Sequence, residues 1–290
     1  MSEQEKKYTI LFPQDGLNKD YFIDNSFRRE VILHFVKNKI QTLNPPLILG
    51  VQGKAGEGKT SHIINICNQL KICVLLIHGS SLGSNFEGEP VNVINEAYLM
   101  ASEYTKKNYD MVILIDDIDT SVASTNEDRK YTANSQLLNG VLMNIANNPH
   151  SIGGKKTEKI PIIFTGNNLM NLYAPLRRSG RMRIFTWTPD DELKIKIIEH
   201  MYKDLISKNE SKEFLKIISR HIKQPISFFV DLKNNLFDDF IMDTISKHNT
   251  INITSIERSI CTAQKQYSYL SKIKIDIDTL ANNKLQDFNI

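Results

Sequence analysis

The sequence predicts an α/β protein whose doubly wound, parallel, five-stranded sheet is followed by an all-α domain. Two observations carry this prediction. Short apolar segments alternate with stretches of helical periodicity between residues 45 and 188, and only helical periodicity remains from residue 189 onward. We therefore expect three parts: an N-terminal segment at residues 1–44, an α/β domain at 45–188 and a helical lid domain at 189–290.

The predicted strands have an uninterrupted apolar character, which is typical of strands buried on both faces of a sheet. The five strands are Leu47–Val51, Ile72–Ile77, Met111–Ile115, Ile160–Phe164 and Arg183–Trp187. Apolar residues at helical spacing predict three intervening helices. These helices are Ser61–Leu70, Glu89–Thr105 and Thr132–Ala146. Strands that alternate with helices pair in parallel through right-handed crossovers. The charged stretch Ser151–Lys159 is expected to be an exposed loop.

The pattern changes at Pro189, which ends the last strand, and Asp190 is suited to cap the next helix. Beyond this point the apolar residues follow helical spacing alone. Examples are Leu193/Ile197/Ile198/Met201, Phe214/Ile217/Ile218/Ile222 and Ile256/Ile260/Ala263/Tyr267. A second, helical domain of about 100 residues is therefore expected.

Composition excludes several classes of protein. Hydrophobic residues make up 41% of the 290 residues, which excludes a globally disordered chain. The longest apolar run, Ile72–Ile77, is too short to cross a membrane, and Met1–Lys7 has no signal-peptide character. The 36 Lys and Arg against 33 Asp and Glu leave +3, which disfavours a dedicated nucleic-acid binder. Three cysteines without CxxC spacing favour free thiols in a reducing, cytoplasmic compartment.

The sharpest motif is GKAGEGKT, which fits GxxxxGK[ST] and lies between a predicted strand and a predicted helix. Its glycines let backbone N–H groups curl around a phosphate, and the helix N-terminus adds positive potential. We expect Lys59 to reach the β- and γ-phosphates of ATP and Thr60 to coordinate Mg²⁺. The predicted nucleotide-binding residues are Gly53, Lys54, Ala55, Gly56, Glu57, Gly58, Lys59, Thr60 and Ser61. The alternative is an ordinary glycine-rich turn.

The strand at Met111–Ile115 ends in two acidic residues, as a partner of this P-loop should. Asp116 is predicted to hold the Mg²⁺ shell. Asp117 is placed to polarise the attacking water, a position where many such ATPases have glutamate, and the shorter side chain predicts slower hydrolysis. Two acids after an apolar strand also occur for structural reasons.

Further polar residues follow the fourth strand. The Asn167 amide is able to orient a water near the γ-phosphate. The segment Arg177–Arg181 carries three arginines and is either a solvated basic turn or the source of an arginine finger. Such a finger stabilises the charge that develops on the γ-phosphate of the nucleotide bound to a neighbouring subunit. An arginine that acts on a neighbour in this way requires a head-to-tail ring.

Together these motifs resemble the AAA+ ATPases and, within them, the rubisco activase family. The resemblance is carried by LMNIA, NP, PIIFTGN, LYAPL and GRM between residues 142 and 182, and it extends from about Tyr21 to Ile241. It implies a nucleotide-dependent ring, hexameric in the family, that remodels a protein client. It further implies that Asn167 is a sensor and that Arg178 and Arg181 are intersubunit fingers.

Several features depart from the family. Only about 40 residues precede the first strand of the domain, which predicts that the family's N-terminal, client-gripping domain is lacking. The segment Thr120–Lys130 has no glycine where the family is glycine-rich. Lys233 and Asn235 stand where arginines are expected in the lid, so Lys233 is a candidate second sensor.

The segment Phe86-Glu87-Gly88 resembles the aromatic pore loop of AAA+ motors that thread proteins. A ring of such phenylalanines would grip an unfolded segment through apolar contacts. The alternative places Phe86 under its own loop.

The leading hypothesis is an ATP-hydrolysing AAA+ ring motor that is Mg²⁺-dependent and acts on a protein client without membrane or nucleic-acid partners. Three alternatives remain: rubisco activase proper, a nucleic-acid-associated loader, and a slowly hydrolysing structural subunit switched by nucleotide.

Overall fold

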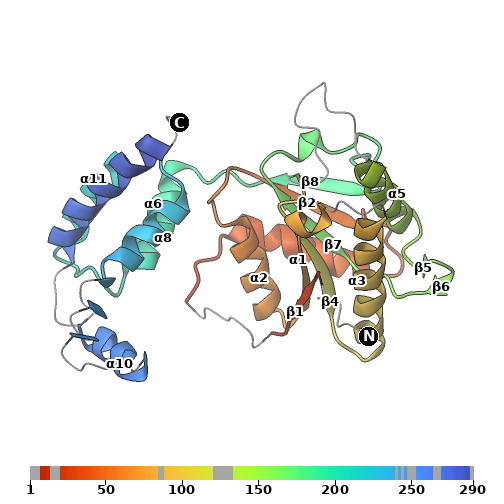
Figure 1. The fold of residues 1–290 in the computed structure, drawn as a ribbon, viewed down its shortest axis with the longest axis horizontal. Helices are drawn as coiled ribbons and strands as arrows, with labels where there is room; N and C mark the ends of the chain where they lie inside the picture. Colours follow the sequence, from red (N-terminus) through yellow and green to blue (C-terminus); the bar gives the residue numbers. More distant parts are fainter. Residues whose placement is uncertain are drawn as a thin grey trace. The chain divides into compact units, whose positions relative to one another are not determined.

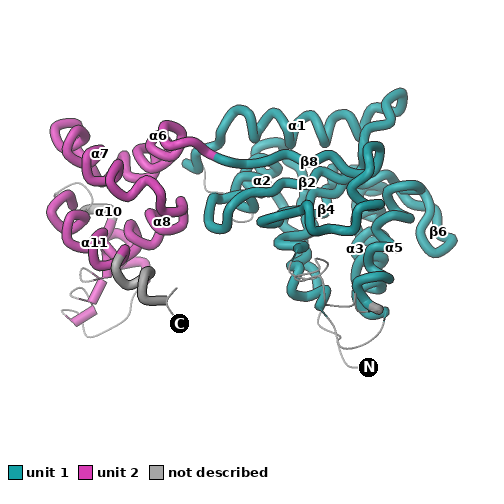
Figure 2. Tube along the Cα trace, turned by 90° about the horizontal axis from the view of Figure 1, so that it is seen from above, with its two compact units in different colours: residues 1–188 teal, residues 189–290 magenta. Residues whose placement is uncertain are grey.

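The computed structural model describes residues 7–13, 20–83, 88–119, 133–238, 241–242, 245–246, 253–263 and 269–287, and its fold is shown in Figure 1. The chain divides into two compact units, Met1–Thr188 and Pro189–Ile290 (Figure 2). Each unit has its own hydrophobic core. The three-part domain division remains a prediction.

The first unit is built on a six-stranded sheet, whose strand order is β1-β3-β4-β7-β2-β8. The strands are β1 (Thr9–Leu11), β2 (Ile48–Gln52), β3 (Cys73–His78), β4 (Met111–Asp116), β7 (Ile162–Gly166) and β8 (Met182–Thr186). The five predicted strands all form and pair in parallel, which confirms the fold class. The sixth, β1, pairs antiparallel with β3 and was not predicted. Its three residues are too few to produce a recognisable pattern.

Helices cover both faces of this sheet (Figure 1). The helices α1 (Asn25–Lys39) and α2 (Lys59–Gln69) lie on one face, and α3 (Glu89–Lys106) and α5 (Ala133–Asn147) on the other. Successive side chains along a strand point to opposite faces of the sheet. Ile48, Ile113 and Ile162 belong to the core cluster under α3 and α5, whereas Leu49 and Leu114, which point the other way, are also buried. Burial on both faces accounts for the continuous apolar runs in the sequence.

The prediction of an exposed loop at residues 151–159 was wrong in part. Two short strands, β5 (Ser151–Ile152) and β6 (Lys155–Lys156), pair there as an antiparallel hairpin. Gly153 and Gly154, with φ of 55° and 77°, supply the two left-handed positions that a tight hairpin turn requires. Ile152 is buried against the core, so an apolar residue anchors a segment whose charges alone suggested a loop.

The described part of the second unit is helical. Its helices are α6 (Asp191–Tyr202), α7 (Ser211–Arg220), α8 (Ile226–Asn235), α10 (Ile253–Ala263) and α11 (Leu270–Asp287). Asp190 caps α6 by accepting a hydrogen bond from the backbone N–H of Leu193 at 2.8 Å. The Tyr202 hydroxyl donates to the Phe229 carbonyl at 2.7 Å inside the core. None of the helices in the described ranges is long and apolar enough to span a bilayer.

Candidate active site

The GxxxxGK[ST] motif forms the connection between β2 and α2. Gly56 and Gly58 adopt left-handed conformations, with φ of 73° and 76°, which favour glycine. Gly58 is the N-cap of α2, and no side chain at this position hydrogen-bonds to the first turn of the helix. The positive end of this 11-residue helix can therefore face a ligand. Lys54, Ala55 and Gly56 are exposed. This arrangement suits a phosphate group, which backbone N–H groups and a helix N-terminus bind together.

Neighbouring strands anchor the loop at both ends. The Gly53 N–H donates to the Gly166 carbonyl at 3.2 Å, and the Trp187 indole N–H donates to the Glu57 carbonyl at 2.7 Å. A Cβ atom on Gly53 would overlap the Trp187 carbonyl oxygen. Trp187 was predicted only as a strand residue. Trp187 comes directly after β8, and β8 pairs with β2. Its indole therefore lies beside the P-loop and stabilises it through the Glu57 carbonyl.

We expect Gly53→Ala to lower the free energy of unfolding by about 2–3 kcal/mol, because the added methyl group must displace backbone. Urea unfolding followed by circular dichroism measures the loss. Gly140→Ala in α5 is the matched control, because nothing lies within 4 Å of its Cβ position and alanine favours a helix. Equal stability of the two variants would contradict the overlap with Trp187.

Lys59 is buried at the base of the loop, with 6% of its surface exposed. Its ammonium donates to the Gly53 carbonyl at 2.8 Å, to the Lys54 carbonyl at 3.0 Å and to the Asn167 side-chain oxygen at 3.3 Å. Burial lowers the pKa of Lys59, while the carboxylates of Asp117, Asp119 and Asp116 oppose this shift. The ammonium therefore rests on oxygen acceptors that phosphate oxygens are able to replace.

Asp116 ends β4 next to the first turn of α2. Its Oδ1 accepts hydrogen bonds from the hydroxyls of Thr60 and, at 2.5 Å, Thr165. His78 Nδ1 lies 3.9 Å from Asp116 Oδ2. Hydroxyl and carboxylate oxygens are the hard donors that Mg²⁺ prefers, so Thr60 and Asp116 fit this ion. The described residues contain no group of three or more His, Cys, Asp or Glu that could hold a metal.

Asp117 follows Asp116 with a left-handed backbone, at φ 50°. Its side chain lies at the carboxyl edge of the sheet and is more exposed than that of Asp116, although part of it is buried. Partial burial and then the neighbouring Asp116 carboxylate raise the pKa of Asp117, whereas Lys59 lowers it. A carboxylate with a raised pKa beside the P-loop is a stronger base, which suits the predicted role in polarising water.

Asp119, which the sequence analysis did not select, holds the backbone at Asn167 and so keeps the Asn167 side chain beside Lys59. Asp119 Oδ2 accepts hydrogen bonds from the backbone N–H of Asn167 at 2.7 Å and of Asn168 at 3.0 Å. A Cβ on Gly166 would lie 3.1 Å from the Asp119 carboxylate. Asp119 comes three residues after Asp116, and this run of acids was the signal available in the sequence.

The structure thus brings the P-loop, Asp116, Asp117 and Asn167 together at the carboxyl ends of β2, β4 and β7. It does not bring Arg178 or Arg181 there. Arg181 directly precedes β8, at the amino end of the sheet. The five residues of β8 place it roughly 16 Å of strand away from the P-loop edge.

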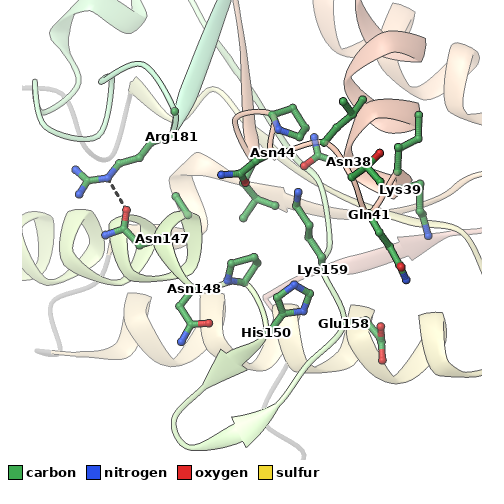
Figure 3. Close-up of a pocket in the computed structure, with 18 of the residues that line it drawn as sticks. Asn38, Lys39, Gln41, Asn44, Asn147, Asn148, His150, Glu158, Lys159 and Arg181 are labelled. Atoms are coloured by element: carbon green, nitrogen blue, oxygen red, sulfur yellow. Dashed lines mark hydrogen bonds between the residues drawn. The ribbon is translucent and has the colours of Figure 1, made fainter.

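The two arginines differ in their surroundings. Arg181 Nε donates to the Asn147 side chain at 2.8 Å, and its Nη1 donates to the Pro175 carbonyl at 2.6 Å. Arg178 is exposed. Both line a cavity of about 980 Å³ at the amino ends of the strands, where Figure 3 shows Arg181 turned toward Asn147.

Other cations line this cavity, and the helices explain part of their placement. Lys39, at the end of α1, forms an ion pair with Asp110 at 3.0 Å, and Lys159 also lines the cavity. The helices α1 and α5 end here, and cationic side chains stabilise helix C-termini.

Two predicted features are not tested by the structure. Phe86 and Glu87 lie outside the described residues, whereas Gly88 (φ 79°) is the N-cap of α3 and donates its N–H to Asn134 Oδ1 at 2.9 Å. Lys233 lies in the second unit, where its ammonium donates to the Met201 carbonyl at 2.6 Å. The pore-loop and second-sensor roles stay predictions.

The parallel sheet and the P-loop beside two strand-end acids define a nucleotide-binding domain of the AAA+ class. In agreement, residues 49–190 match the family model described as the ATPase family associated with various cellular activities. The chain therefore carries an AAA+ domain, and over most of its length it resembles the rubisco activases, which confirms the predicted resemblance.

Three relatives illustrate this likeness. The ribulose bisphosphate carboxylase/oxygenase activase of Nostoc sp. is 35% identical over 237 residues, which are 78% of this chain and 56% of that protein. That of Anabaena sp. is 33% identical over 244 residues, 81% of this chain and 58% of the relative. The chloroplastic protein of Phaseolus vulgaris is 29% identical over 274 residues, 92% and 61% respectively. The chain spans less than two thirds of each relative.

Proposed function

We propose that this protein is an ATP-hydrolysing, Mg²⁺-dependent AAA+ motor that assembles into a ring, hexameric as the resemblance implies, and remodels a protein client. The observation that carries the proposal is the convergence of Lys59, Thr60, Asp116, Asp117 and Asn167 at one edge of the sheet. The similarity to named activases supports the same conclusion.

Each residue has a role that its position suits. Lys59 would exchange its loop carbonyls for the β- and γ-phosphates of ATP, and Thr60 and Asp116 would hold the Mg²⁺ shell. When bound, Mg²⁺ would neutralise charge on the phosphates. Asp117 would polarise the attacking water, and Asn167 would orient it. Lys59 and Thr60 bond to groups of the site itself, so binding of phosphate and Mg²⁺ would have to replace these contacts.

The ring is supported by the position of the arginines. Arg178 and Arg181 lie at the amino end of the sheet, whereas the P-loop of the same unit lies at the carboxyl end. A role for them at a phosphate therefore requires the nucleotide of another copy. Such head-to-tail contacts close into a ring when the rotation between copies permits.

The direct test is release of phosphate from ATP by the purified chain, measured with and without Mg²⁺ over a range of protein concentrations. We expect Mg²⁺-dependent turnover whose rate per subunit rises with protein concentration, because each complete site needs two copies. Asp117→Asn should retain nucleotide binding while losing at least about 100-fold in turnover. Turnover that is independent of protein concentration would contradict the ring.

The client is tested by capture on the Asp117→Asn variant in the presence of ATP, with Lys59→Ala as the control that should not bind nucleotide. Rubisco activase proper is the narrower candidate, favoured by the names of the relatives. It predicts that inhibited ribulose bisphosphate carboxylase/oxygenase is reactivated in an ATP-dependent reaction. Failure of reactivation together with capture of another protein would exclude this candidate and retain the motor.

Two other outcomes would favour a different function. Turnover that stays far below one per minute under all conditions would favour a nucleotide-switched structural subunit. Salt-sensitive binding to DNA at low micromolar protein would favour a nucleic-acid-associated loader.

A further inference from the structure

Thr165 is a buried residue of β7 that contacts both acids at the end of β4. None of its surface is exposed. Its hydroxyl oxygen lies 2.5 Å from Asp116 Oδ1 and 2.9 Å from the backbone nitrogen of Asp117. An N–H group only donates, so the hydroxyl must accept from Asp117, and its single hydrogen is left for the Asp116 carboxylate. The direction of both hydrogen bonds follows from this donor count.

The Thr165 backbone adds a third contact to the same segment. Its carbonyl accepts a hydrogen bond from the Ile118 N–H at 3.0 Å. One residue of β7 therefore holds three consecutive residues, from Asp116 to Ile118. The middle one, Asp117, has the left-handed backbone conformation that residues other than glycine rarely adopt. Conformations of this kind persist where the surroundings hold them from several sides.

The opposite side of this turn is held by Gly79, which follows β3. A Cβ on Gly79 would overlap the Asp117 carbonyl oxygen and lie 2.9 Å from the Asp116 carbonyl oxygen. The turn that directs Asp117 is thus enclosed between Gly79 and Thr165. The backbone at Gly79 therefore approaches this turn closely from the side of β3, while Thr165 contacts it from β7.

We infer that Thr165 is a positioning residue: its hydroxyl fixes the Asp117 carboxylate relative to the Asp116 carboxylate. This inference rests on the proposed ATP hydrolysis. Thr60 and Thr165 both donate to Asp116 Oδ1, so the carboxylate is oriented by one hydroxyl from the P-loop helix and one from β7. The contact joins the strand that ends in Asn167 to the strand that ends in the two acids.

The test compares Thr165→Val, which keeps the shape and removes the hydroxyl, with Thr165→Ser, which keeps the hydroxyl. We expect kcat of the valine variant to fall about 10- to 100-fold, as is typical for partners that orient catalytic or metal-binding groups. KM for ATP should change by less than about 3-fold, because the phosphate contacts of Lys59 remain. Serine should restore kcat to within about 3-fold of the original chain.

A second readout does not depend on hydrolysis. Hydrogen–deuterium exchange of the nucleotide-free protein, followed on peptides that cover residues 112–118, should show faster exchange at Asp117 in the valine variant and not in the serine variant. If the valine variant does not fold, Thr165→Ala is measured in its place. A valine variant with unchanged kcat would overturn the inference, whatever its exchange, as would a serine variant with the same losses.

The two readouts separate the inference from the proposed function. Absence of turnover in the original chain would refute the proposed hydrolysis and, with it, the positioning role, whatever the exchange result. Normal turnover in the original chain with an unchanged kcat in Thr165→Val would refute the positioning role alone.

Discussion

Lys59→Ala is expected to abolish turnover, with a loss of at least about 100-fold in kcat/KM, and to weaken binding of ATP markedly. The ammonium is the cation at the base of the P-loop, and it lies among groups that are poorly solvated. Loss of a preorganised donor in such a site costs about 10²- to 10³-fold in rate. Phosphate release and titration with a fluorescent ATP analogue measure the two effects.

Lys54→Ala is the matched control for this variant. Lys54 belongs to the same loop, but its side chain is exposed. The structure gives it a backbone role, since its carbonyl accepts a hydrogen bond from Lys59. We expect Lys54→Ala to change kcat/KM by less than about 3-fold, because an exposed charge is screened by solvent. Similar losses in both variants would contradict the central position assigned to Lys59.

Arg178→Ala is expected to lose turnover on the order of 10³-fold while its stability stays within about 0.5 kcal/mol, because fingers act on the transition state and this side chain is exposed. Arg181→Ala should instead lose about 0.5–1.5 kcal/mol of stability, since it removes the hydrogen bonds that its guanidinium donates to Asn147 and Pro175. Urea unfolding and phosphate release separate the two effects.

Mixing variants tests whether the arginine acts on another copy. Arg178→Ala supplies an intact P-loop, and Lys59→Ala supplies an intact Arg178. Mixed rings should therefore recover part of the turnover that each variant lacks alone, because some interfaces pair the two intact halves. A mixture no more active than its components, or an active Arg178→Ala variant, would contradict an arginine acting in trans.

Much of the fold was predictable because local pattern and tertiary role agree in this chain. Strands buried on both faces must be apolar throughout, and the helices that cover them show a 3.6-residue period. The strand β1 and the hairpin β5–β6 were missed for a common reason. β1 has three residues and the strands of the hairpin have two each, which is too few to show a period. The conformation of β1 depends on its pairing with β3, far along the chain, and that of the hairpin depends on its Gly-Gly turn.

The candidate site shows the same division. The P-loop and the acids of β4 are recognisable because their chemistry depends on contiguous residues. Thr165, Asp119 and Trp187 escaped notice because they act through residues that lie 48, 48 and 130 positions away. Parallel strands with long crossovers bring such residues together, and no local spacing records the contact.

By itself, the sequence determined the class of fold, the P-loop and the likeness to the rubisco activases, because each is written in short runs of neighbouring residues. Tertiary structure alone decided which side chains hold the site in place and which arginine is free. It placed Thr165 on both acids of β4, tied Arg181 to its own unit and left Arg178 exposed. The physical reason is that hydrogen bonds between strands depend on register and approach, which only the folded sheet defines.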